Sequence, residues 1–333
     1  MKLSTRKVTK LIGLAASAAV LSLSIFSAHA EEPTRPECIA PAQPGGGFDL
    51  TCRLAKQALE QSEQLKAPMR IVYMPGGIGA VAYNSIVTQR NNEPGTIVAY
   101  SSGSLLNLAQ KKFGRYDSDA VRWLSAIGTD YGVAVVRDDS SFQNLNDLMN
   151  ALSEDPTKVV FGAGGTVGSQ DWMKAALTAK AANVNHKNMR FVAFEGGGEG
   201  LTALRGGHIQ VFMGDAAEVL SLIEGGAPIR LLAVYSEERL PGIFEDVPTA
   251  KEQGFDIEWP IIRGFYVGPK VSDEAYNWWV EAFDNAMSAE GYEALRLQLG
   301  LFPFSMTGAE LDSYIHKQVD QYEELASEFG LVK

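Results

Sequence analysis

The chain has 333 residues, 46% of them hydrophobic, and its 29 basic and 40 acidic residues give a formal net charge of −11 at pH 7. A net negative charge of this size argues against a protein that binds nucleic acid or an anionic membrane surface. A chain of this length is expected to form two domains or lobes, because one hydrophobic core rarely serves more than about 250–300 residues.

The first 30 residues have the three parts of a secretory signal peptide. A basic start precedes an apolar stretch, Leu11 to Phe26, and the small-residue motif Ala28-His29-Ala30 follows as a cleavage site. The alternative is an uncleaved membrane anchor, but the apolar stretch is short for a span. We expect cleavage after Ala30 and a periplasmic mature chain that begins near Glu31. Loss of four bases leaves 25 basic against 40 acidic residues, a net charge of about −15.

A glycine-rich loop stands between an apolar and an amphipathic segment near the start of this mature chain. Cys38-Ile39-Ala40 is a short apolar strand, Gly45 to Gly47 leave the backbone bare, and apolar residues recur at helical spacing from Leu50 to Leu59. Strand, loop and first helical turn together direct N–H groups and the positive end of a helix dipole at one place. This arrangement predicts a site for an anion such as a carboxylate or a phosphate.

Two cysteines, Cys38 and Cys52, bracket the loop. In an oxidising periplasm they are able to form a disulfide, and two free buried thiols are the alternative. The distance between their Cα atoms decides between these states, and the sequence does not supply it.

The unit of strand, small-residue loop and helix occurs twice more. The apolar strand Ala67–Tyr73 runs into Gly76-Gly77, and the strand Thr96–Tyr100 opens into Ser101-Ser102. Repeated units of this kind are typical of a doubly wound parallel sheet, which binds its ligands beyond the carboxyl ends of its strands.

The pattern begins again after two apolar runs between Trp123 and Val136. Glycine loops at 162–168 and 196–200 and the pair Gly214-Asp215 follow three further strands. The strands expected in this part are Lys158–Phe161, Arg190–Phe194, His208–Met213 and Arg230–Tyr235. Glycine loops from two successive α/β units predict a cleft between lobes that holds something small and polar.

The chain is expected to cross between the lobes twice, near 131–136 and near 263–267, and then to continue mainly as helices from Ser272 onward. We therefore predict that lobe 1 comprises residues 31–132 and 265–333, and lobe 2 residues 133–264. Two crossings predict a hinge that closes the lobes over a ligand.

Patterns for catalysis or cofactor binding are missing or incomplete. Gly162 and Gly164 begin a dinucleotide fingerprint, but its third glycine falls at Gly168, whereas the pattern requires it at position 167. The mature histidines are scattered, without metal-ligand spacing, and no serine lies in a G-x-S-x-G motif. We expect no cofactor, no metal and no catalytic residue.

Four carboxylates near the loops have simpler explanations than acid–base chemistry. Asp49 stands where a helix N-cap is expected, and Asp215 is placed to cap the next helix or to orient the cleft. Glu195 and Glu199 would repel an anion, so we expect both to face solvent.

The motifs of the mature chain resemble, in order, those of the extracytoplasmic solute receptors of tripartite tricarboxylate transporters, also called Bug-type receptors. The general likeness rests on Pro44-Gly45-Gly46-Gly47-Phe48-Asp49-x-x-x-Arg53, Met74-Pro75-Gly76-Gly77, the segment 162–169 and the segment 247–254. A closer likeness to the tricarboxylate-binding (TctC-type) member rests on 37–41, 168–174, 194–199 and 259–269.

This resemblance implies an α/β fold of the bilobal, type II periplasmic-binding-protein class, a Venus flytrap with two hinge strands. It implies a ligand held by backbone N–H groups and waters of lobe 1 and by a Gly-Thr-x-Gly-Ser loop and an aspartate of lobe 2. The ligand-binding residues predicted for this chain are Gly46, Gly47, Phe48, Asp49, Gly76, Gly77, Ser101, Ser102, Thr166, Ser169, Gly197, Asp215 and Arg263.

Arg263 departs from the family pattern, in which many relatives have an aromatic residue nearby. An arginine here is able to pair bidentately with an additional ligand carboxylate. The alternative is an exposed arginine at the hinge, since arginine is mostly exposed in proteins.

The sequence thus predicts a monomeric periplasmic receptor that captures citrate or a related tricarboxylate and delivers it to the membrane permease subunits of a secondary transporter. A receptor for a dicarboxylate or an aromatic carboxylate is the first alternative, because loop N–H groups recognise a carboxylate without identifying the molecule that carries it. A periplasmic enzyme with Asp49 or Asp215 as general base is the second.

Overall fold

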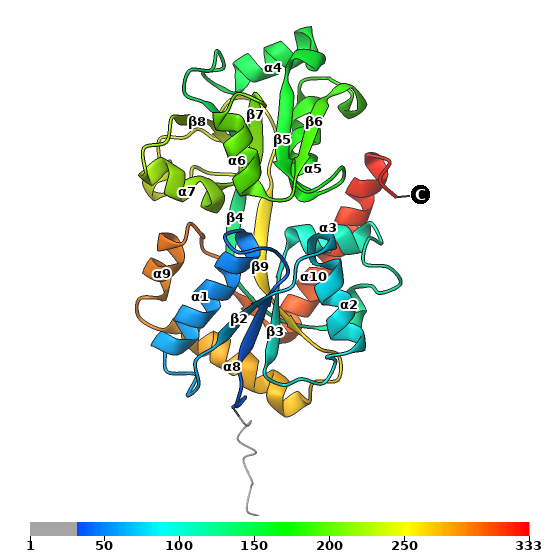
Figure 1. Ribbon diagram of the computed structural model, residues 1–333, viewed down its shortest axis with the longest axis vertical. Helices are drawn as coiled ribbons and strands as arrows, with labels where there is room; N and C mark the ends of the chain where they lie inside the picture. The colour runs from blue at the N-terminus through cyan, green and yellow to red at the C-terminus, as the bar shows by residue number, and fades with distance from the viewer. Residues whose placement is uncertain (1–31, 333) are drawn as a thin grey trace, which may run out of the picture.

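Two α/β lobes lie one above the other along the long axis of the molecule (Figure 1). This arrangement is seen in a computed structural model, which describes residues 32–332. The predicted signal peptide and its cleavage site lie outside the described residues. Within the described part, no helix is long and apolar enough to cross a membrane.

Lobe 1 contains the three predicted units of strand, loop and helix. Its strands β1, β2 and β3 are parallel, with β1 in the middle, so all three strand-to-helix loops lie at the same edge of the sheet. In Figure 1 that edge faces lobe 2. The elements are β1 (Glu37–Ala40), α1 (Gly47–Gln61), β2 (Arg70–Tyr73), α2 (Ala80–Thr88), β3 (Thr96–Ser101) and α3 (Ser102–Ala109).

Two strands connect the lobes. The strand β4 (Arg122–Arg137) is 16 residues long, and its antiparallel neighbour β9 (Pro260–Val267) returns the chain to lobe 1. The sequence suggested two apolar runs in this region, but the structure has one continuous strand. β4 pairs with β9 and β10 (Met306–Thr307) in lobe 1 and with β7 (Val211–Asp215) and β8 (Ile229–Val234) in lobe 2.

The sheet is mixed, which the repeated units did not predict. The strand order is β2-β1-β3-β9-β4-β7-β5-β6, and β9 is antiparallel both to β3 and to β4. The reason is the connectivity: β4 leaves lobe 1 and β9 re-enters it, so the two strands must run in opposite directions. The predicted lobe boundaries, at 132/133 and 264/265, fall inside these strands and stay predictions.

Lobe 2 repeats the arrangement of lobe 1. The strands β5, β6 and β7 are parallel; β5 and β6 each end in a loop that begins a helix, and β7 continues directly into a helix. The strand β8 pairs antiparallel with β4. The elements are α4 (Leu145–Glu154), β5 (Val160–Gly164), α5 (Gln170–Ala181), β6 (Arg190–Phe194), α6 (Gly197–Arg205), β7 (Val211–Asp215), α7 (Ala216–Glu224) and β8 (Ile229–Val234).

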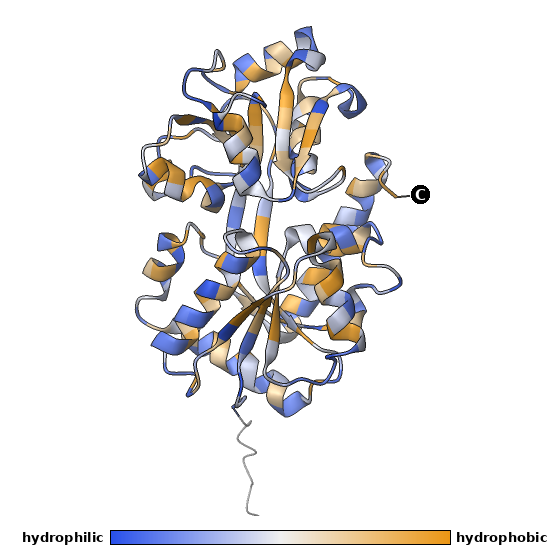
Figure 2. Ribbon diagram, in the orientation of Figure 1, coloured by the Kyte–Doolittle hydropathy of each residue, from blue (hydrophilic) through white to orange (hydrophobic). Residues whose placement is uncertain are grey.

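The C-terminal part is mainly helical, as predicted, and most of it packs on lobe 1. The ring of Phe283 on α8 stacks on Phe265 of β9 with 5.2 Å between centroids, and Trp279 is fully buried beside them. Figure 2 shows hydrophobic residues concentrated on the strands and on the inner faces of the surrounding helices. The elements are α8 (Asp273–Ser288), α9 (Tyr292–Gln298), β10 (Met306–Thr307) and α10 (Gly308–Glu328).

Candidate ligand-binding site

The N-terminus of α1 is open toward the other lobe. Gly46 is the N-cap residue, and no side chain of the described chain caps the helix. The N–H groups of a first helical turn have no partner within the helix, and the helix dipole adds a partial positive charge there. A 15-residue helix that begins in bare glycine backbone is therefore suited to bind an anion.

Asp49 does not cap the helix, which corrects the sequence-based interpretation. It is the third residue of α1, and its Oδ2 accepts a hydrogen bond of 2.8 Å from the N–H of Gly45, before the helix. Asp49 is only 4% exposed. Its carboxylate therefore fixes the loop through Gly45 and leaves the N–H groups of the first helical turn free to bind a ligand.

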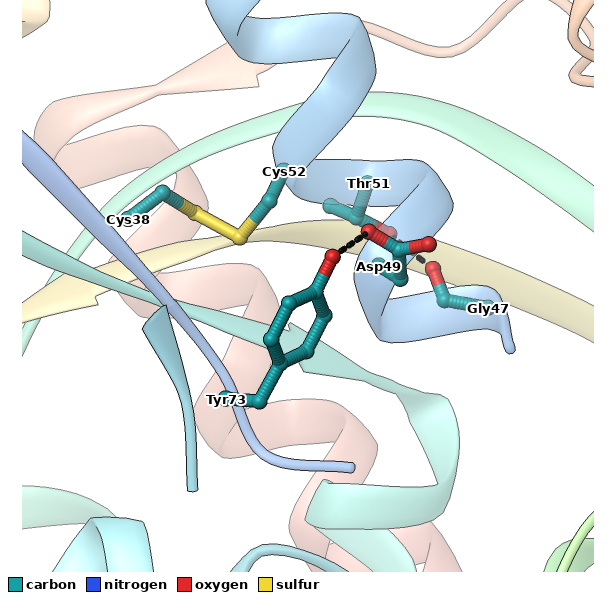
Figure 3. Close-up of a disulfide and its surroundings, with 6 residues drawn as sticks. All are labelled: Cys38, Gly47, Asp49, Thr51, Cys52 and Tyr73. Carbon is teal, nitrogen blue, oxygen red and sulfur yellow. Dashed lines mark hydrogen bonds between the residues drawn. A yellow bond between two sulfur atoms is a disulfide. The ribbon is translucent and has the colours of Figure 1, made fainter. Parts of the chain in front are cut away.

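Three contacts hold the start of α1 and its loop in place (Figure 3). The hydroxyl of Tyr73, at the end of β2, donates to Asp49 Oδ1 at 2.9 Å, and this bond is the main cause of the raised pKa of Tyr73. A disulfide joins Cys38 to Cys52, with their Cα atoms 5.8 Å apart. Thr51 Oγ1 donates to the carbonyl of Gly47 at 2.7 Å. The sequence did not reveal that Tyr73 helps to position this loop.

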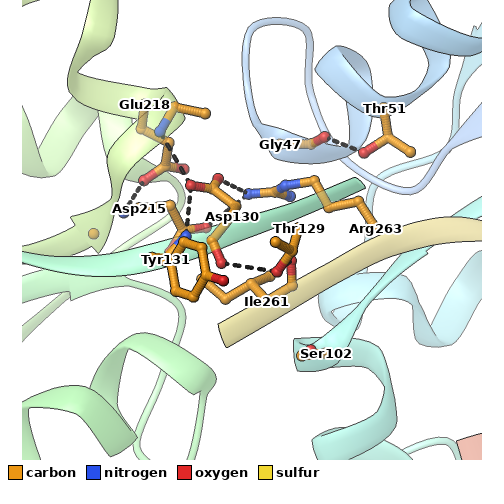
Figure 4. Close-up of polar contacts among 12 residues, drawn as sticks. Gly47, Thr51, Ser102, Thr129, Asp130, Tyr131, Asp215, Glu218, Ile261 and Arg263 are labelled. Atoms are coloured by element: carbon orange, nitrogen blue, oxygen red, sulfur yellow. Dashed lines mark hydrogen bonds and ion pairs between the residues drawn. The ribbon is translucent and has the colours of Figure 1, made fainter. Parts of the chain in front are cut away.

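Arg263 lies between the lobes and is almost completely buried. It is 2% exposed, so the exposed hinge arginine considered above is excluded. Its Nη2 lies 2.7 Å from Asp130 Oδ2 and 2.9 Å from Asp215 Oδ2 (Figure 4). Burial acts to lower the pKa of Arg263, but the two aspartates raise it further than burial lowers it. Its charge is thus already shared by two carboxylates of the protein.

The guanidinium also contacts the lobe 1 loop. A Cβ atom added to Gly47 would lie 2.1 Å from Nη1 of Arg263, so only glycine allows this approach. The buried Nε of Arg263 has no hydrogen-bond partner among residues 32–332. An unpaired donor of a buried cation therefore lies close to the open N-terminus of α1.

A second buried cation lies in lobe 2. Lys174 on α5 is completely buried, and its Nζ lies 2.6 Å from Asp215 Oδ1 and 2.8 Å from Asp171 Oδ1. Burial acts to raise the pKa of Asp215, but Lys174 and Arg263 lower it below its ordinary value. Asp215 therefore stays ionised and links both cations.

Two further carboxyl groups complete this charge cluster. Burial raises the pKa of Asp171 to about 6, although Lys174 opposes the rise. Burial also raises the pKa of Glu218 to about 8, and the charge of Asp215 adds to the rise. The cluster thus contains two cations, Lys174 and Arg263, and four carboxyl groups, Asp130, Asp171, Asp215 and Glu218.

The predicted helix cap at Asp215 is present. The Asp215 side chain accepts from the backbone of the first turn of α7, and Glu218 Oε2 accepts from the N–H of Asp215 at 3.3 Å. This is a capping box, which satisfies two helix-end donors reciprocally. Glu195 and Glu199 are exposed, as predicted.

The serines of the predicted site are occupied by contacts within the protein. Ser101 caps α3, and the hydroxyl of Ser102 accepts from the N–H of Ile262 at 3.0 Å. Ser169 caps α5 by accepting from the N–H of Trp172 at 3.2 Å, whereas Thr166 is exposed. These serines shape the strand ends, and their hydroxyls have less capacity for a ligand than the sequence suggested.

The remaining predicted residues are glycines at strand ends. Gly76 and Gly77 have positive φ angles of 134° and 57°, so the turn after β2 favours glycine. Gly197 begins α6 in lobe 2, where Gly196 is the N-cap and no side chain of residues 32–332 caps the helix. A Cβ on Gly197 would lie 2.7 Å from Glu218 Oε2, so α6 begins beside the charge cluster.

Loops of the two lobes are in contact. Gln110 Nε2, just after α3, donates to the carbonyl of Gly168 in lobe 2 at 2.7 Å. A Cβ on Gly165 would lie 2.8 Å from Ile78 of lobe 1, and one on Gly103 would lie 2.9 Å from Gln170 Oε1. The structure therefore represents a closed arrangement of the lobes.

The described residues contain no group of three or more His, Cys, Asp or Glu side chains arranged to hold a metal ion. Two facing lobes, two hinge strands and glycine loops at the facing edges define a solute-binding receptor of the bilobal type II class. The chain belongs to the tripartite tricarboxylate transporter family receptors (TctC), whose family model matches residues 54–331.

Individual relatives are distant in sequence and close in fold. A UPF0065 protein of Bordetella pertussis is 24% identical over 314 residues, which cover 93% of this chain and 95% of that protein. A Rhodopseudomonas palustris protein solved with adipate has a TM-score of 0.80 at 18% identity, covering 90% of this chain and 99% of its own. MatC of R. palustris, solved with bound malate, has a TM-score of 0.73 at 17% identity, covering 87% and 98%.

Family membership answers two questions raised by the sequence. The fold is the predicted bilobal one, and the family consists of substrate-binding receptors, so the chain is a receptor and not an enzyme. The general bases considered above, Asp49 and Asp215, instead hold backbone N–H groups and cations in place.

Proposed function

We propose that this protein captures a small organic acid in the periplasm and delivers it to the membrane permease subunits of a tripartite tricarboxylate transporter. One observation carries the proposal: the uncapped N-terminus of α1 lies against the guanidinium of Arg263, whose buried Nε has no partner among residues 32–332. Helix N–H groups and a guanidinium donor together are suited to a carboxylate. Export through the predicted signal peptide would place the receptor where such acids arrive.

Closure of the two lobes over the ligand is expected because each lobe contributes part of the proposed site. Lobe 1 contributes the N-terminus of α1, and lobe 2 contributes the uncapped N-terminus of α6. An acid with a carboxylate at each end would contact both lobes at once. Such a ligand binds the closed form more strongly than the open one, and so shifts the population toward closure.

The acid we propose first is citrate or a related tricarboxylate, on the closer likeness of the sequence to TctC-type receptors. In this case Arg263 would supply charge to a third carboxylate. It would have to do so while Nη2 remains bonded to Asp130 and Asp215, so Nε and Nη1 are the groups left for the ligand.

A dicarboxylate is the second candidate, and the charge cluster favours it. Three carboxylates, Asp130, Asp171 and Asp215, form ion pairs with the two cations, so little positive charge remains for a third ligand carboxylate. The relatives solved with malate and adipate carry acids of this class.

A thermal-shift screen of the mature protein tests both candidates. Citrate, isocitrate, tricarballylate, malate, succinate, adipate and benzoate would be compared at the same ionic strength. A ligand present at a hundred times its Kd stabilises the folded protein by about 2.7 kcal/mol. The largest shift with a tricarboxylate supports the first candidate, and the largest shift with malate, succinate or adipate supports the second. A screen in which none of these acids shifts the midpoint would contradict the proposal for this class of ligand.

A further inference from the structure

The last helix, α10, begins on lobe 1 and ends beside lobe 2. In lobe 1, His316 Nε2 on α10 lies 2.7 Å from Asp119 Oδ1, and the ring of Tyr314 lies 5.5 Å from that of Phe304. The far end of the helix lies beside α5 of lobe 2 (Figure 1). With 21 residues, α10 is roughly 31 Å long, so one stiff helix extends over part of both lobes.

The residues at the end of α10 form a distinct contact with lobe 2. Phe329 is 5% exposed, and its ring centroid lies 5.0 Å from His186 and 6.1 Å from Trp172. Glu328 forms an ion pair with Lys180 of α5. Aromatic pairs of this kind stabilise a structure by more than the burial of their apolar area alone.

The same contact continues to the rim of the closed cleft. A Cβ on Gly168 would lie 3.3 Å from Leu331 Cδ2, and the carbonyl of Gly168 accepts the hydrogen bond from Gln110 of lobe 1. The loop between β5 and α5 therefore contacts both the residue that follows α3 and the C-terminal segment. Separating the lobes at this rim would also draw the loop away from Leu331.

The contact lies at the surface of the molecule. An open surface pocket of about 320 Å³ lies beside it, lined by Lys180, Asn183, Val184, Asn185, His186, Glu328 and Phe329. The Glu328–Lys180 ion pair is half-exposed on both sides, and ion pairs of this kind contribute little to stability. The contact is therefore weak enough to break while each lobe stays folded.

We propose that the segment Glu328–Leu331 is a strap that engages lobe 2 only when the cleft is closed, so that Phe329 adjusts the balance between open and closed receptor. The covalent hinge consists of β4 and β9, and a stiff α10 anchored on lobe 1 cannot follow lobe 2 as the hinge opens. The inference concerns the fold and holds whichever acid is bound.

The test compares Phe329→Ala with Phe304→Ala in the mature, ligand-free protein. Phe304 packs on Tyr314 of the same helix, away from the strap, so its variant loses a comparable aromatic contact without removing a residue of the strap. Small-angle X-ray scattering measures the radius of gyration, and the rate of C-terminal residue release by carboxypeptidase measures exposure of the segment.

We expect Phe329→Ala to lower the closed-to-open ratio about tenfold, which corresponds to about 1.4 kcal/mol. The radius of gyration and the release rate should both rise relative to wild type and to Phe304→Ala. A Phe329→Leu variant, which keeps an apolar side chain, should restore most of the wild-type behaviour. Unchanged radius and release rate in Phe329→Ala would overturn the proposal, as would a lowered unfolding midpoint accompanied by no change in either.

Discussion

Arg263, on a strand that connects the lobes, packs directly against Gly47 in the loop that begins α1: a methyl group on Gly47 would lie 2.1 Å from the guanidinium. The side chain that unites Asp130 of β4 with Asp215 of lobe 2 thus also contacts the proposed carboxylate loop of lobe 1. A change in the loop is therefore expected to disturb the hinge, and a change in the hinge to disturb the loop.

Gly47→Ala tests this relationship. The new methyl group must displace either the loop or Arg263, and overpacking of a buried contact typically costs about 1–3 kcal/mol. We expect a lower unfolding midpoint and at least a tenfold weaker affinity for the acid that gives the largest shift in the thermal screen, measured by calorimetry. Gly46→Ala is the matched control, because a Cβ at Gly46 has no neighbour within 4 Å. Equal effects of the two substitutions would contradict the packing argument.

Arg263→Ala and Arg263→Lys separate the structural role of the arginine from its proposed role in binding. The alanine variant leaves Asp130 and Asp215 buried without this cation, and breaking a buried pair in this way costs about 3–5 kcal/mol. The lysine variant keeps the charge and loses the planar fork, so we expect it to fold with a smaller loss.

The measurement for Arg263→Lys is affinity for a tricarboxylate and for a monocarboxylate under the same conditions. If Arg263 contacts an additional carboxylate, the tricarboxylate should lose at least tenfold and the monocarboxylate much less. Proportional losses for both acids would show that Arg263 acts only through the structure of the hinge.

Tyr73→Phe tests whether the hydrogen bond from Tyr73 to Asp49 positions the loop before α1. The substitution removes the 2.9 Å hydrogen bond to Asp49 and leaves the ring in place. Because Asp49 keeps its bond to the Gly45 N–H, we expect a stability loss of about 1 kcal/mol or less and a several-fold weaker ligand affinity. Tyr116→Phe is the control, since within residues 32–332 its hydroxyl bonds only to exposed Arg115. If both variants bind like wild type, Tyr73 does not position the loop.

These predictions use contacts that the sequence revealed only in part. The strand-to-helix loops could be predicted, because glycines and alternating apolar segments are local signals: β1, β3 and β6 lie within a residue of their expected bounds. The charge cluster could not be predicted, because Arg263 and Asp130 are 133 positions apart and meet only when β9 pairs with β4. The spacing of Asp171 and Lys174 was a local signal that could have been used, since residues three apart lie on one face of a helix.

The continuous strand β4 illustrates a different limit on what can be predicted from the sequence. Its residues are buried almost throughout, so an apolar pattern alone could not distinguish one strand that serves both lobes from two shorter strands. The mixed sheet follows from this crossing, and the crossing is a property of the whole chain.

Glu218 makes the stability of the receptor dependent on pH. Burial raises the pKa of Glu218 to about 8, above its ordinary value of 4.5, so the folded state binds this proton more tightly than the unfolded state. Stability linked to a raised carboxyl pKa is fully present at pH values below the unfolded pKa and is lost as the pH rises toward the folded one. Asp215 has a lowered pKa and acts in the opposite direction, but only at acidic pH.

We therefore expect the unfolding midpoint of the wild type to fall between about pH 5 and pH 8. Glu218→Gln should reduce this fall, because glutamine cannot ionise yet still completes the capping box with Asp215. Glu199→Gln is the control, since Glu199 is exposed in the first turn of α6. Thermal unfolding from pH 5 to pH 9 measures all three proteins. The same slope in wild type and Glu218→Gln would show that Glu218 is ionised in the folded protein throughout this range.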